Sequence, residues 1–113
     1  MKENVIKQKS FDFALRVVKL YQYLTTEKKE FVMAKQLLRC GTSIGANIRE
    51  AEHAESKADF VHKLSIALKE ANETEYWLDL LVHSGYIDPK AYQSIIIDCQ
   101  EVLKILISII NSP

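Results

Sequence analysis

The sequence has little of the material from which loops, disulfide frameworks and membrane spans are made. Its 113 residues include three glycines, two prolines and two cysteines. No apolar run approaches the roughly 18 residues of a transmembrane helix, and no charged-then-apolar leader with a cleavage site is present. We therefore expect a cytoplasmic protein that makes no membrane contact. Cys40 and Cys99 show no metal-ligand spacing and fall in apolar helical stripes, which predicts buried free thiols.

Net charge and catalytic motifs are missing as well. Lysine plus arginine equals aspartate plus glutamate at 15 each, so the whole chain has no general attraction to phosphate backbones. There is no glycine-rich phosphate loop, and Ser43 and Ser56 lack a partnered base. We therefore expect no catalytic residue, no cofactor and no enzymatic activity.

What is present describes one globular domain. With 48% hydrophobic and 27% charged residues, the chain is too apolar to be disordered and long enough to bury a core. Apolar residues recur at helical spacing throughout. The predicted fold is all-α: a single antiparallel up-and-down four-helix bundle over residues 1–113, with helices at about 10–26, 31–53, 57–84 and 89–111.

Four local signals set the expected helix ends. Ser10 is a plausible N-cap, with residues 1–9 frayed before it. Ser56, followed three residues later by Asp59, resembles a capping box. Gly85 is a C-cap candidate, and Asp88 before a proline is the expected N-cap of the last helix.

The last predicted helix is too apolar for one buried face. One stripe can fill the core: Tyr92, Ile96, Cys99, Leu103, Leu106 and Ile110. The residues left over predict an exposed oligomer interface: Ile95, Val102, Ile105 and Ile109. The alternative is that the N-terminal segment or the loops cover them.

Charge is divided between the two halves of the chain. Residues 1–50 hold ten basic and five acidic residues, and residues 51–113 hold five basic and ten acidic, giving +5 and −5. Subunits with two such faces can stack head to tail and close into a ring. Alternatively, the charges pair within one subunit.

The stretch Thr-Ser-Ile-Gly-Ala-Asn-Ile-Arg-Glu at residues 42–50 interrupts the second predicted helix with small and polar residues. Gly41 and Gly45 each cost about 1 kcal/mol relative to alanine in a helix, so they indicate a close backbone approach or a bend. One interpretation is a close helix crossing with a buried, hydrogen-bonded Asn47. The other is direct contact of Asn47 or Arg49 with a ligand or nucleic acid.

A polar network is expected beside this stretch. Ser43, Asn47 and Glu50 share one row of the helix, and Glu73 of the next helix is placed to reach Asn47 or Arg49.

The Ser-Ile-Gly-Ala-Asn-Ile-x-Glu pattern, with Ser56, Asp59-Phe60 and the run from Ile66 to Leu78, resembles proteins encoded in intervening sequences of bacterial 23S ribosomal RNA genes. That resemblance implies a non-enzymatic four-helix bundle assembled into a ring. The chain is also similar to the accessory bundle proteins of diversity-generating retroelements, which form pentamers and bind a reverse transcriptase and nucleic acid. Those relatives are basic, and this chain has no net charge.

The sequence thus predicts a homo-oligomeric adaptor that meets structured RNA or a nucleic-acid enzyme. The expected contacts are the basic residues Lys28, Lys29, Lys35, Arg39 and Arg49. A protein-only interaction module is the alternative. A remote alternative is a carboxylate-bridged metal enzyme built from the pairs Glu50/His53 and Asp59/His62, whose spacing suits a di-iron site although both pairs flank one loop.

Overall fold

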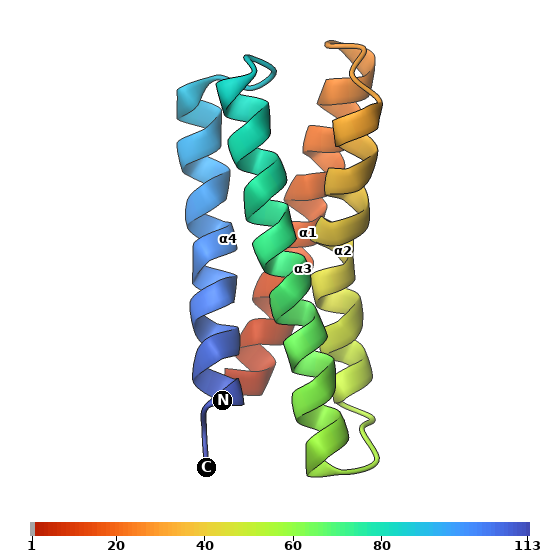
Figure 1. The fold of residues 1–113 in the computed structure, drawn as a ribbon, viewed down its shortest axis with the longest axis vertical. Coiled ribbons are helices and arrows are strands. Elements are labelled where there is room, and N and C mark those ends of the chain that lie inside the picture. Colours follow the sequence, from red (N-terminus) through yellow and green to blue (C-terminus); the bar gives the residue numbers. More distant parts are fainter. Residues whose placement is uncertain (1) are drawn as a thin grey trace.

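The computed structural model describes residues 2–113, and their side chains from Glu3 onward, as four antiparallel helices (Figure 1). They are α1 (Lys2–Thr26), α2 (Val32–Ala51), α3 (Lys57–His83) and α4 (Pro89–Ile110). Consecutive helices pack side by side and α4 returns to α1, whereas within residues 2–113 the diagonal pairs make no close backbone approach. The predicted up-and-down four-helix bundle is confirmed.

The loop between α2 and α3 ends in a side-chain cap. The Ser56 hydroxyl accepts a hydrogen bond from the Asp59 amide at 3.0 Å, as predicted. The Asp59 carboxylate reaches back one residue beyond the cap and accepts from the Glu55 amide at 3.2 Å. This shifted capping box satisfies amides at the helix start and fixes where α3 begins.

The loop between α3 and α4 is set by backbone geometry. Gly85 has φ +83°, a left-handed conformation that side chains disfavour. The Tyr86 amide then donates to the Leu81 carbonyl at 2.9 Å, which is the Schellman ending of a helix. Asp88 caps α4 through the Ala91 amide at 2.7 Å. These predicted ends are confirmed.

The predicted start of the first helix was wrong. α1 begins at Lys2, and Ser10 is a buried residue inside it whose hydroxyl donates to the Lys7 carbonyl at 3.0 Å. The reason is Ile6, which lies one heptad before Phe13 and is buried with it, so the apolar face of α1 begins about one turn before Ser10. Met1, part of the segment predicted to fray, lies outside the described residues.

The longer α1 also overturns the predicted oligomer interface on α4. Of that set, Ile95, Val102 and Ile109 are buried within their own subunit, and Ile105 is half-buried against the core. Three residues of α1 at heptad spacing lie opposite three residues of α4 at the same spacing. Each pair lines one shared hollow: Ile6 with Ile109, Phe13 with Val102, and Leu20 with Ile95. Since α4 lies between α3 and α1, it buries two stripes rather than one.

The second and third helices each bury one regular stripe. On α3 the residues that recur at steps of three and four from Leu64 to Leu81 are buried, and Phe60, one turn earlier, is half-buried. On α2 the stripe from Leu37 to Ala51 is buried, and Met33, one turn earlier, is half-buried. The bundle measures 44 × 21 × 19 Å, and none of the four helices has the length and apolar character that a bilayer crossing requires.

Candidate functional site

The glycines of α2 mark its crossing with α1. A Cβ atom on Gly41 would lie 2.8 Å from both methyl groups of Val17, which is fully buried. A Cβ atom on Gly45 would meet the Ser10 hydroxyl at 3.4 Å, an ordinary contact. The predicted close helix approach at Gly41 is therefore confirmed, although a side chain of α1 makes it rather than the backbone, and Asn47 is half-buried rather than buried.

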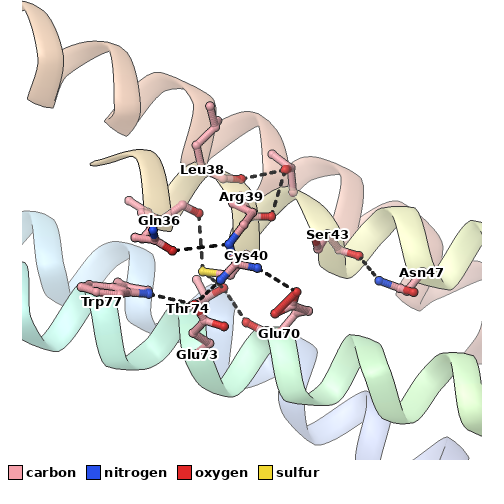
Figure 2. Close-up of polar contacts among 12 residues, drawn as sticks. Gln36, Leu38, Arg39, Cys40, Ser43, Asn47, Glu70, Glu73, Thr74 and Trp77 are labelled. Atoms are coloured by element: carbon pink, nitrogen blue, oxygen red, sulfur yellow. Dashed lines mark hydrogen bonds and ion pairs between the residues drawn. The ribbon is translucent and has the colours of Figure 1, made fainter. Parts of the chain in front are cut away.

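The polar network predicted beside these glycines does not form. The Asn47 amide donates at 2.9 Å to the Ser43 carbonyl of its own helix, and Figure 2 shows this pair lying apart from Glu73. Glu50 instead accepts from Lys63 of α3 at 2.9 Å. The prediction failed because the relative register of α2 and α3 brings neither Asn47 nor Arg49 level with Glu73.

Glu73 is paired with Arg39. The Arg39 guanidinium contacts the Glu70 carboxylate at 3.1 Å and the Glu73 carboxylate, which also accepts from the Trp77 indole at 3.1 Å (Figure 2). The Trp77 hydrogen bond, and after it the Arg39 hydrogen bond, lower the pKa of Glu73 below its ordinary value. The hydrogen bond to Glu73 raises the pKa of Arg39. Arg39 is thus held within the subunit.

Both cysteines are buried free thiols, as predicted. Cys40 accepts a hydrogen bond from the Thr74 hydroxyl at 3.2 Å, and burial raises the pKa of its thiol. Burial likewise raises the pKa of Cys99 to about 12. Thiols that stay protonated at neutral pH are poor nucleophiles and poor metal ligands.

The four residues of the predicted alternative metal site lie in or beside the loop between α2 and α3 and do not converge. Glu50 binds Lys63 and Asp59 binds a backbone amide, while His53 and His62 are exposed. Among the described side chains, no three of the His, Cys, Asp or Glu type gather as a metal site would require.

Opposite charges meet across the helix contacts. Five of the six ion pairs found in residues 3–113 join a base from residues 1–50 to an acid from residues 51–113. They are Lys7–Glu52, Lys9–Glu101, Arg16–Asp98, Arg39–Glu70 and Arg39–Glu73. The division of charge along the sequence is therefore largely neutralised within one subunit.

The other predicted basic contacts are exposed. Lys28 and Lys29 lie in the loop between α1 and α2, and Lys35 lies in the first turns of α2. None of these three ammonium groups forms an ion pair with another described side chain. Arg49 instead lies over the Phe11 ring, with its guanidinium carbon 5.6 Å from the ring centre.

An apolar surface that the sequence analysis did not identify lies near the same end of the bundle. Arg39 faces Glu73 across antiparallel helices, so one heptad along each helix brings Val32 level with Leu80. Val32 is 74% exposed and Tyr76, one turn before Leu80, is 56% exposed. We call this surface the α2–α3 stripe: the exposed residues Val32, Tyr76 and Leu80, with the half-buried Trp77. The signal that could have found it is apolar residues lying off the core seam.

Comparisons with known proteins support the predicted resemblance. The family model described as 23S rRNA-intervening sequence protein matches residues 2–108. The chain is 63% identical to a protein of unknown function from the S23 ribosomal protein family of Bacteroides thetaiotaomicron, whose crystal structure superposes with a TM-score of 0.98. The match covers 99% of this chain and 100% of that one. A search of curated proteins finds no match.

Replacing Gly41 by alanine tests the close crossing. Alanine would gain about 1 kcal/mol of helix propensity, but the clash with Val17 costs about 1–3 kcal/mol, so Gly41→Ala should lower the free energy of unfolding by about 1 kcal/mol. Gly45→Ala is the matched control, and it should be neutral or stabilising. Urea unfolding measures both. Equal effects of the two substitutions would contradict the packing account of Gly41.

Glu73→Gln tests the electrostatic role of the Arg39 cluster. A depressed pKa means that the Glu73 carboxylate stabilises the fold above its ordinary pKa of 4.5, and that this contribution is lost as pH falls through the lowered value. Glu73→Gln should therefore cost about 0.5–1 kcal/mol at neutral pH and progressively less below pH 4.5. Glu27→Gln, at an exposed carboxylate, is the control. A deficit that stays constant with pH would rule out a charge effect.

Proposed function

This chain belongs to the 23S rRNA-intervening sequence protein family, and we propose that it is a non-enzymatic, homo-oligomeric adaptor that contacts RNA through its surface. The observation that carries the proposal is the end of the bundle where α2 begins. The exposed α2–α3 stripe and three lysines without ion pairs, Lys28, Lys29 and Lys35, belong to that end. The α2–α3 stripe is suited to contact with protein, and the three lysines are suited to contact with phosphate.

The α2–α3 stripe is the proposed contact between copies. Its side chains are large and apolar, and Tyr76 and Trp77 pack edge to face with ring centres 5.2 Å apart. Tyrosine and tryptophan are enriched at the energetic centres of protein interfaces. The Glu73 carboxylate, one turn before Trp77, is held by Arg39 of the same subunit, so the proposed contact rests on the apolar side chains of the stripe. The same stripe of a second copy is the apolar surface that complements it.

The lysine cluster is the proposed RNA contact. Lys7, Lys9, Arg16 and Arg39 are paired within the subunit, so Lys28, Lys29 and Lys35 are three of the five bases without an ion pair among the described side chains of residues 3–50, the others being Lys19 and Arg49. Two of the three lie in a loop, where side chains reach outward without displacing packed neighbours. In the cytoplasm, assembly of several copies would multiply this weak cluster into one of useful strength.

A protein-only module is the second candidate. It is favoured by the zero net charge of the chain and by the internal pairing of its charges. In that case the lysines serve solubility, and the exposed apolar side chains alone do the binding.

Light scattering tests the assembly. We expect the wild-type chain to be an oligomer at micromolar concentration. The double variant Val32→Ser/Tyr76→Gln should dissociate at least about tenfold more readily, because losing each buried apolar side chain costs about 1.5 kcal/mol or more. The matched control is Ile97→Gln/Ile107→Gln, which removes comparably exposed residues from α4. A wild-type monomer at micromolar concentration would remove the homo-oligomer.

Filter binding of an RNA hairpin across a salt series tests the RNA contact. Wild-type affinity should fall steeply between about 50 mM and about 200 mM salt, with a slope set by the number of phosphates neutralised. Changing Lys28, Lys29 and Lys35 to glutamine should flatten that slope by up to about three phosphate contacts. The control changes Lys57, Lys69 and Lys104 to glutamine, which alters the net charge equally. No binding at low salt would favour the protein-only module.

A further inference from the structure

Arg49 differs from the other two arginines of the chain. Arg16 binds Asp98 and Arg39 binds two glutamates, whereas Arg49 contacts no carboxylate among the described side chains. Its acidic neighbours in sequence are occupied elsewhere, since Glu50 binds Lys63 and Glu52 binds Lys7. Arg49 lies on the Phe11 ring instead, which leaves its guanidinium donors available to an anion.

A trough opens beside this pair, between α1 and α2. It encloses about 260 Å³ and is lined by small residues on its floor, among them Ala14, Gly45 and Ala46. Gly45 and Ala46 leave the space empty because neither has a side chain beyond Cβ. The Phe11 ring, 46% exposed, and the side chains of Lys7 and Arg49 also line it. Because Lys7 is paired with Glu52, Arg49 is the unpaired cation of the trough.

We propose that this trough holds an unpaired nucleotide of an RNA strand. A nucleobase is flat and apolar on its faces and would stack on the face of the Phe11 ring that Arg49 does not cover, a contact that requires no base-specific hydrogen bond. The phosphate next to that base would meet Arg49, whose planar donors match phosphate oxygens. A base within a duplex is already stacked and does not enter, so the site selects single strands or loops.

This inference rests on the RNA contact proposed above and adds a second element to it. Lys28, Lys29 and Lys35 supply a phosphate contact that is indifferent to base pairing. The trough, near the opposite end of α2, recognises the absence of pairing. Phe11 lies off the buried stripe of α1 that contains Ile6, Phe13 and Val17, so the core does not require an aromatic ring at this position.

Fluorescence anisotropy with a labelled oligouridylate of about twelve nucleotides tests the site, with a blunt RNA duplex as the second probe. Phe11→Leu should weaken binding of the single strand about tenfold, within the range measured for the loss of one stacked base, and leave duplex binding unchanged. Phe11→Tyr, which keeps the ring, should remain close to wild type. Arg49→Gln should weaken the single strand and reduce its salt dependence by about one phosphate.

Tyr23→Leu is the matched control, because Tyr23 is a second half-exposed aromatic residue of α1 that does not line the trough. The proposal is overturned if Phe11→Leu and Tyr23→Leu have the same effect on oligouridylate. It is also overturned if Phe11→Leu lowers the oligomer mass without changing RNA affinity, since the trough is then a protein contact. A wild-type chain that binds the hairpin but not the single strand defeats this inference alone, whereas one that binds neither RNA also defeats the RNA contact proposed above.

Discussion

The apolar contact between α1 and α4 is the constraint on which the rest of this structure depends. α4 carries more apolar surface than one neighbouring helix can cover, and Ile6, Phe13 and Leu20 of α1 cover what α3 leaves. The contact requires α1 to begin near the start of the chain, because without Ile6 the last turns of α4 would expose Ile109. It buries two apolar stripes of α4, so Ile97 and Ile107 are the large apolar side chains of this helix that stay exposed.

The same contact decides where charge remains available. α1 is basic and α4 is acidic where they meet, and the pairs Lys9–Glu101 and Arg16–Asp98 border the apolar seam. Each exposed pair contributes at most about 1 kcal/mol, so their main effect is on the surface potential rather than on stability. With Lys7–Glu52 and the Arg39 pairs, they neutralise four of the ten bases of residues 1–50. The described bases of this half that form no ion pair are Lys19, Lys28, Lys29, Lys35 and Arg49.

The sequence predicted the elements well and their mutual arrangement poorly. The ends at Ser56, Gly85 and Asp88 follow from short-range chemistry, in which a cap residue and its partner lie within a few positions, and all three are confirmed. The start of α1 was missed because Ser10 has the chemistry of an N-cap but sits in the middle of a face that Ile6 extends.

The errors at the candidate site share one physical origin. To predict whether Glu73 contacts Asn47, or whether Ile95 is exposed, one has to know the relative register and rotation of two helices. The spacing of apolar residues within one helix does not give that information. Arg39 meets Glu73 because α2 and α3 are offset by their caps and loop. Ile95 is buried because a helix distant in sequence reaches it. The α2–α3 stripe and Phe11 were not predicted because their apolar residues lie off the helical stripes that form the core.

In the stretch at residues 42–50, core packing explains the residues on the inner side of the helix but not Arg49 on its outer side. Its inner side is explained by packing, because Ile44 and Ile48 fill the core and the neighbouring Gly41 admits Val17. Arg49, on the outer side, has no such explanation. A solvent-facing helix position tolerates almost any good helix former, and alanine, glutamate or lysine would serve at Arg49. A guanidinium placed on an aromatic ring, above a hollow that small residues leave open, is an arrangement that stability does not require, and binding of a flat, anionic ligand gives it a physical reason.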